Sequence, residues 1–239
     1  MIRLSGWRAK LGVLVPTLNN TMEPELYKMA PEGVSVHFSK IKENEEDLRR
    51  MAEEIPRAAA ELADAEVNII AFGCTAGSLI GGTGYDEQLI RKIEETTHIP
   101  AITTSTAVIS ALKELRARTL CVATAYREEV NRKVREFLES HGLEVLNIGG
   151  LGCKGLEAAH VSVKRVYELA KEVFDPDADA LFISCTDLQT LDVLETLEFD
   201  LNRTVISSNQ ATMWLMLKQV GVSEPMAGYG TLLAKTSTD

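Results

Sequence analysis

The sequence predicts an α/β protein of two pseudo-symmetric, doubly wound lobes, with parallel sheets and an active-site cleft between the lobes. Apolar runs of strand length alternate with amphipathic helical segments, which is typical of parallel sheets covered by helices on both faces. The order of the segments also repeats. Each half has a first strand, an apolar strand followed by Cys-Thr, and a strand ending in Ser or Thr before a helix. This repeat predicts a duplicated lobe.

In the first half, an apolar strand over 11–16 ends at Pro16 and leads into a polar loop. Apolar residues at three- and four-residue spacing predict a helix over 44–65, and Pro56 predicts a kink or break within it. The remaining patterns predict a helix over 23–29, strands over 34–38 and 67–73, a glycine-rich turn over 77–84, a helix over 86–96, a strand over 100–104 and a helix over 106–116.

The second half follows the same order. Its patterns predict strands over 119–124, 143–148, 179–184 and 204–208, and helices over 128–141, 162–174, 188–197 and 211–220. We therefore expect a first lobe over 1–117 and a second lobe over 118–220, with the C-terminal segment 221–239 packing back on the first lobe.

The composition limits the partners and the compartment. The chain has 45% hydrophobic residues, and its 35 acidic and 25 basic residues give a net charge of −10. This charge argues against nucleic acid and anionic membranes as partners, and it requires local dipoles to hold an anionic substrate. No stretch approaches the ~20 apolar residues of a membrane-spanning helix, and the N-terminus lacks the apolar core of a signal peptide. We expect a cytoplasmic protein that acts on a small molecule, and the sequence leaves a homo-oligomer open.

Four cysteines are present, without a CxxC pair and without clustered histidines. A zinc site and a disulfide framework are therefore not expected, and no cofactor is implied. Cys121 lies mid-strand and is predicted to be a core residue. Cys153 lies in a glycine-rich loop that could approach the cleft, and the sequence leaves open whether it does.

Cys74 and Cys185 have a different context, because each follows an apolar strand and precedes a threonine. Ligands of parallel sheets bind beyond the carboxyl ends of the strands, so two such thiols can face one substrate from opposite lobes. Two buried core cysteines are the alternative interpretation, and the matching contexts count against it.

The residues after each cysteine are predicted to begin a helix, whose dipole and free N–H groups would favour the thiolate. There, backbone N–H groups and the hydroxyls of Thr75 and Thr186 are candidates to bind a substrate carboxylate. Asp187 is predicted to cap the helix that follows Cys185.

Short motifs in the first lobe carry a family resemblance. The sequence Val-Pro-Thr-Leu-Asn-Asn-Thr-Met-Glu over 15–23 resembles the pattern V-P-S-S-N-x-x-x-E of maleate isomerases, whose Asn matches Asn19. Gly-Cys-Thr over 73–75 matches the first-lobe thiol of isomerases and racemases, which arylmalonate decarboxylases replace with Gly. The chain thus resembles the Asp/Glu racemase superfamily, in the branch of maleate cis–trans isomerases and arylmalonate decarboxylases.

The second lobe extends the resemblance. Ala-Thr-Ala-Tyr over 123–126 resembles the loop whose tyrosine binds a substrate carboxylate, and this role falls to Tyr126. Ile-Ser-Cys over 183–185 matches the second catalytic cysteine. Maleate isomerases carry a further substrate-binding Asn in the loop before the second-lobe helix, where this chain has Gly-Leu-Glu-Ala, closer to the decarboxylases. Leu156 is the substrate-contact candidate in that loop.

The resemblance implies a cofactor-independent isomerase that uses Cys74 and Cys185 on a small dicarboxylate. Conversion of maleate to fumarate is the first expectation, through addition of the Cys74 thiolate and an enediolate-type intermediate. Three alternatives stay open: an arylmalonate-type decarboxylase with Cys185 as proton donor, an Asp/Glu-type racemase with the thiols as opposed acid and base, and a non-catalytic anion-binding protein.

Overall fold

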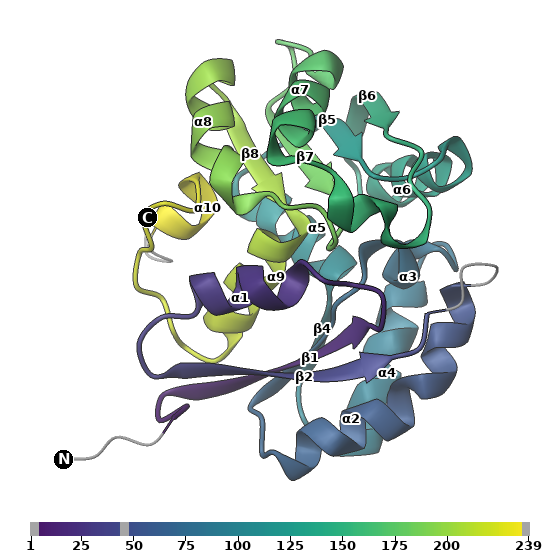
Figure 1. The fold of residues 1–239 in the computed structure, drawn as a ribbon, viewed down its shortest axis with the longest axis vertical. Helices are drawn as coiled ribbons and strands as arrows, with labels where there is room; N and C mark the ends of the chain where they lie inside the picture. Colours follow the sequence, from purple (N-terminus) through teal and green to yellow (C-terminus); the bar gives the residue numbers. More distant parts are fainter. Residues whose placement is uncertain (1–4, 44–47, 236–239) are drawn as a thin grey trace.

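Two lobes, each with a four-stranded parallel sheet, make up the protein (Figure 1). The computed structural model describes residues 5–43 and 48–235. The first sheet has the order β2-β1-β3-β4 and the second the order β6-β5-β7-β8, so the two lobes share one topology. The predicted fold class and its pseudo-symmetry are confirmed. The strands are β1 (Ala9–Pro16), β2 (Val34–Ile41), β3 (Ile69–Phe72), β4 (Ala101–Thr103), β5 (Thr119–Thr124), β6 (Glu144–Gly150), β7 (Ala180–Ser184) and β8 (Thr204–Ser207).

The helices follow the predicted order, with differences at their ends. The break predicted at Pro56 is present: a 3-10 helix ends at Glu54, and Pro56 is the second residue of α2. An N–H at this position has no hydrogen-bond partner within the helix, so proline is tolerated there. The first residues of the predicted 44–65 helix, 44–47, lie outside the described residues. The helices are α1 (Met22–Met29), α2 (Ile55–Asp64), α3 (Thr75–Leu79), α4 (Tyr85–Thr97), α5 (Thr104–Glu114), α6 (Glu128–Ser140), α7 (Val163–Val173), α8 (Leu191–Leu201), α9 (Ser208–Gln219) and α10 (Thr231–Ala234), with 3-10 helices at Leu48–Glu54 and Gly155–His160.

Helices α5 and α9 hold equivalent positions in the two lobes and pack against each other, and α1 also packs against α9 (Figure 1). One hydrophobic cluster runs through this contact and includes residues of both lobes, such as Val13, Val108 and Ile183. A second cluster, which contains Ile55 and Phe72, fills the outer side of the first sheet. The lobes are therefore held together by a shared apolar core.

The C-terminal segment contacts both lobes. Helix α10 packs against α9 and β8 of the second lobe. Glu224 pairs with Arg8 of the first lobe, and the Tyr229 hydroxyl donates to the carbonyl of Lys28 at 2.6 Å. The C-terminal segment thus packs on the second lobe and also bonds to the first. The lobe boundary at 117 stays a prediction.

Two carboxylates cross the lobe interface and cap each other's helices. Glu25 of α1 is buried, and its Oε1 accepts hydrogen bonds from the backbone N–H groups of Thr190 and Leu191 at 2.6 and 3.1 Å, at the start of α8. In return, Asp187 Oδ1 accepts from the N–H groups of Asn20 and Thr21 at 2.9 and 3.2 Å, at the start of α1. Asp187 was predicted to cap its own helix, and this is wrong. Its Oδ1 instead holds the two residues that precede α1 of the first lobe, and α8, which begins four residues after Asp187, receives Glu25.

This arrangement predicts a pH-dependent contribution to stability. Burial raises the pKa of Glu25, the hydrogen bonds to Asn209 and to α8 oppose that rise, and the folded state therefore holds the Glu25 proton more tightly than the unfolded chain. The free energy of unfolding should fall as the pH rises from the ordinary carboxyl pKa of ~4.3 through the higher folded value.

The Glu25→Gln variant lacks this titration. Urea unfolding of both proteins between pH 4 and pH 7 measures the difference, and we expect the wild type to lose stability relative to the variant as the pH rises. A difference that stays constant, or that changes in the wild type's favour, contradicts the assignment.

Candidate active site

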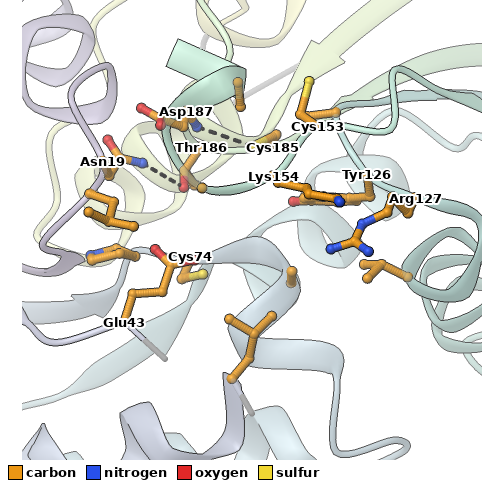
Figure 2. Close-up of a pocket in the computed structure, with 18 of the residues that line it drawn as sticks. Asn19, Glu43, Cys74, Tyr126, Arg127, Cys153, Lys154, Cys185, Thr186 and Asp187 are labelled. Carbon is orange, nitrogen blue, oxygen red and sulfur yellow. Dashed lines mark hydrogen bonds between the residues drawn. The ribbon is translucent and has the colours of Figure 1, made fainter. Parts of the chain in front are cut away.

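A cavity of about 360 Å³ lies between the lobes, beyond the carboxyl ends of the central strands (Figure 2). The first lobe contributes Asn19, Glu43 and Cys74 to its wall, and the second lobe contributes a longer set: Ala125, Tyr126, Arg127, Glu129, Val130, Cys153, Lys154, Gly155, Ala158, Cys185, Thr186 and Asp187. Both cysteines that the sequence singled out line this one cavity. The position is the one expected for ligands of parallel α/β sheets.

Cys74 follows β3 after one residue, Gly73, and serves as the N-cap of α3. Its Sγ accepts a hydrogen bond from the backbone N–H of Gly77 at 3.3 Å. A Cβ at Gly77 would lie 3.0 Å from this sulfur, so glycine allows the close turn. Burial raises the pKa of Cys74 well above that of a free thiol, and the carboxylate of Glu43 raises it further.

Cys185 directly follows β7, but a turn follows it where a helix was predicted. Its Sγ accepts from the N–H of Asp187 at 3.4 Å, and its own N–H donates to Ser208 Oγ at 3.2 Å. Burial raises the pKa of Cys185 to about 12, against the smaller effects of the Asp187 N–H and the Tyr126 hydroxyl.

Backbone N–H groups do reach both sulfurs, as predicted, but burial outweighs them and the pKa of each thiol is raised where a lowered value was expected. Removing a thiolate from water costs more than one backbone N–H returns, so burial dominates the pKa at both positions. At neutral pH the two groups are thiols, and a thiolate has to be generated during the reaction.

Tyr126 stands beside both thiols at the end of β5. Burial raises its pKa well above the ordinary value, the two cysteines add to the rise, and a hydrogen bond with the Thr75 side chain opposes it. Its backbone N–H is held by Thr124 Oγ1 at 3.1 Å. The phenol is therefore neutral and able to donate a hydrogen bond to an oxygen anion in the cavity.

Asn19 is oriented by the turn that begins α1. Its Oδ1 accepts from the N–H groups of Thr21 and Met22 at 3.1 and 2.9 Å, which leaves the amide Nδ2 to face the second lobe. Nδ2 donates to Thr186 Oγ1 at 3.0 Å, across the cavity wall (Figure 2). Asn19 and Thr186 thus place neighbouring polar atoms from the two lobes at one point.

Other predicted residues lie differently. Thr75 is buried, donates to Ser208 Oγ at 2.8 Å and acts on the cavity through Tyr126. Leu156 is 42% exposed and lies outside the set of described residues that line the cavity. Cys153, whose position the sequence left open, lines the cavity. Its loop follows β6, and the Cys153 N–H donates a hydrogen bond to the carbonyl of Ala125, next to Tyr126. Cys121 is fully buried in β5, as predicted.

The sequence did not single out four charged groups of the cavity: Glu43, Arg127, Glu129 and Lys154. Arg127 directly follows the predicted substrate-binding residue Tyr126, and Lys154 directly follows Cys153. Nothing in their local pattern distinguished them from other surface charges. Among the described residues, no group of three or more His, Cys, Asp or Glu side chains could hold a metal ion, and none of the helices is long and apolar enough to cross a membrane.

Two parallel-sheet lobes that each place a thiol on a shared cavity are typical of the Asp/Glu racemase superfamily. The family profile for arylmalonate decarboxylase matches residues 11–233, and the chain belongs to the arylmalonate decarboxylase family. It is 32% identical to an arylmalonate decarboxylase from Bordetella bronchiseptica, over 69% of this chain and 70% of that protein. It is also 26% identical to a maleate isomerase from Geobacillus stearothermophilus, over 94% of this chain and 97% of that protein.

Solved structures agree with this assignment. A cysteine-to-alanine variant of the maleate isomerase Iso from Pseudomonas putida S16, crystallised with maleate, has a TM-score of 0.90 at 26% identity, covering 95% of this chain and 97% of that one. A glycine-to-cysteine variant of arylmalonate decarboxylase has a TM-score of 0.83 at 27% identity, covering 95% and 100%. The branch of the superfamily predicted from the sequence is confirmed.

The pKa shifts predict the order in which the cysteines react. Burial also raises the pKa of Cys153, but this residue is partly exposed, whereas Cys74 and Cys185 are buried. In substrate-free protein at pH 7.5, iodoacetamide should alkylate Cys153 before the other two lining cysteines, because thiolate fraction and access both limit the reaction. Peptide mass spectrometry over time measures the order. Alkylation of Cys74 first would show that its thiol is activated before substrate binds.

Proposed function

We propose that the protein is a cofactor-independent isomerase that converts maleate to fumarate. The observation that carries this proposal is the position of Cys74 and Cys185 on the two sides of one cavity. Full-length similarity to maleate isomerases, including one crystallised with maleate, supports it. Arylmalonate decarboxylation needs only the second thiol, so the presence of Cys74 favours isomerisation.

Maleate would lie with its alkene carbons between the two thiols. Asn19 Nδ2 and the Tyr126 hydroxyl donate to its carboxylates, together with Thr186 Oγ1. These donors are held by the protein before substrate arrives, so little reorganisation is needed when charge develops on a carboxylate.

The reaction then follows from the parts of the site. Cys74 gives its proton to a basic group, for which the Glu43 carboxylate on the same wall is placed, and the sulfur forms a bond to one alkene carbon. The π electrons move to the carboxylate on the other carbon and form an enediolate. The former double bond rotates, the C–S bond breaks and fumarate results. Cys185 gives and removes a proton when the intermediate is protonated.

Turnover in D₂O tests the reaction type. The protein is incubated separately with maleate, phenylmalonate and L-aspartate, and proton NMR follows each mixture. We expect fumarate from maleate. Its vinyl protons stay undeuterated when the adduct rotates as the enediolate, and they carry solvent deuterium when Cys185 protonates the enediolate first. Loss of CO₂ from phenylmalonate without fumarate formation would show a decarboxylase, and deuterium at Cα of aspartate a racemase.

Substitution of the first thiol tests the role of Cys74. The Cys74→Ala variant should lose maleate conversion, because the nucleophile is gone and the remaining donors do not form the adduct. Cys121→Ala is the matched control, since this thiol is buried in β5 away from the cavity. Full activity of Cys74→Ala would refute a two-thiol mechanism.

Removal of one hydroxyl tests the contribution of Tyr126. Tyr126→Phe keeps the ring and deletes the donor, so kcat/KM for maleate should fall by about 10²–10³, as it does when other enzymes lose one oxyanion donor. Steady-state kinetics at pH 7.5 measures the change. A fall of less than threefold would mean that Tyr126 does not bind the developing charge.

One observation favours arylmalonate decarboxylation as a second candidate. The loop at 155–158 carries Gly-Leu-Glu-Ala, and Gly155 and Ala158 of this loop line the cavity. For isomerisation and for decarboxylation alike, covalent and acid–base catalysis by the thiols suffices, so the proposed enzyme uses no cofactor. We also propose that it is cytoplasmic. A homo-oligomer also remains open.

A further inference from the structure

The cavity is larger than maleate needs. Pockets of about 300–1,000 Å³ hold drug-sized ligands, and this one measures about 360 Å³. A four-carbon dicarboxylate placed between Cys74 and Cys185 fills only the part next to the thiols. The rest extends along the second lobe, between the start of α6 and the loop that holds Cys153, and it has room for a substituent on the substrate.

Two cations line this additional space. Arg127 precedes α6 and Lys154 precedes the 3-10 helix at 155–160, so they come from the segments after two neighbouring strands, β5 and β6. Figure 2 shows both on the second-lobe side of the cavity, next to Tyr126. Within the described part of the chain, neither side chain forms an ion pair, whereas many other Arg and Lys residues do. Two unpaired cations on one cavity wall favour an anionic group between them.

The cavity also has acidic groups, which affect where an anion can bind. Glu43 lies on the first-lobe wall near Cys74 (Figure 2), and it repels a substrate anion from that wall. Glu129, the second residue of α6, also lines the cavity, two residues after Arg127. The protein's net charge of −10 opposes an anionic ligand overall. Among the described residues that line the cavity, Arg127 and Lys154 are the two cations that attract an extra carboxylate.

We propose that the preferred substrate is a cis-butenedioate that carries a further carboxylate arm on one alkene carbon. This inference rests on the proposed isomerase function and names its substrate class. The two cis carboxylates occupy the donors at Asn19 and Tyr126, and the arm reaches Arg127 and Lys154. Small apolar contacts from Val130 and Ala158 cover the methylene of the arm.

The chemistry is the same addition and elimination, and it balances without a further reactant. Cys74 sulfur bonds to the unsubstituted alkene carbon, and the electron pair moves to the carboxylate on the substituted carbon. After rotation about the single bond, the pair returns, the C–S bond breaks and the trans tricarboxylate leaves. The arm stays bound to Arg127 and Lys154 throughout, which anchors one end while the other rotates.

Three substrates separate charge from size. The probes are maleate, 2-methylmaleate and cis-propene-1,2,3-tricarboxylate (cis-aconitate), with cis–trans conversion followed by proton NMR. We expect kcat/KM for the tricarboxylate to exceed that for both dicarboxylates by roughly tenfold or more, because a charge-assisted hydrogen bond adds about that much. Added salt should reduce this preference.

A matched pair of variants assigns the effect to the two cations. In the Arg127→Gln/Lys154→Gln variant, the ratio of kcat/KM for the tricarboxylate to that for maleate should fall by about tenfold or more. Arg132→Gln removes an exposed cation from α6 outside the cavity and should keep the wild-type ratio.

The outcomes distinguish this inference from the proposed function. If maleate is converted and the tricarboxylate is no better than 2-methylmaleate, the substrate class is wrong and the isomerase function stands. An unchanged ratio in the double variant likewise overturns the role of Arg127 and Lys154. If neither maleate nor the tricarboxylate is isomerised, the proposed function itself fails, and this inference with it.

Discussion

The reciprocal caps between α1 and α8 are the constraint on which the site depends. Glu25 of α1 accepts from the N–H groups of Thr190 and Leu191 at the start of α8. Asp187 of the second lobe accepts from the N–H groups of Asn20 and Thr21, the two residues that precede α1. Each carboxyl group supplies acceptor oxygens to N–H groups of the other lobe, and these hydrogen bonds offset part of the cost of burying it. The pair fixes the first-lobe helix against the second lobe more specifically than an apolar contact can.

The catalytic candidates are attached directly to these caps. Asn19 lies in the turn that Asp187 holds, and Thr186 and Cys185 directly precede Asp187. The Asn19–Thr186 hydrogen bond therefore follows from the position of the caps. On the other side, α5 and α9 pack together below the strand ends that carry the two thiols. The contacts that place the two lobes therefore also position Asn19, Thr186 and Cys185 in the site.

Much of the fold follows from local sequence patterns. Buried parallel strands are continuous apolar runs, so β3 and β7 were visible as such, and the repeated Cys-Thr after each placed both thiols at strand ends. Pro56 marked the start of α2 for a local steric reason. The helix start after Cys74 was also predicted and corresponds to α3, whereas the expected glycine-rich turn over 77–84 overlaps the end of that helix.

The rest depends on contacts between residues distant in the sequence. Glu25 and Asp187 act across the lobe interface, and neither has a local pattern that names its partner. The thiol pKa values follow from burial, which no nearby residue encodes, so helix activation was predicted where desolvation dominates. Arg127 and Lys154 line the same cavity because they follow β5 and β6, which are neighbours in the sheet.

The central claim is that Cys74 forms a bond to the substrate while Cys185 faces it from the other lobe. The most direct measurement is peptide mass spectrometry of the Cys185→Ser variant, mixed with maleate and quenched in acid so that an enediolate adduct is protonated and retained. The account predicts one substrate mass added to the peptide that contains Cys74. An unmodified Cys74 peptide in a variant that still converts maleate, or an adduct found on Cys153 instead, would contradict it.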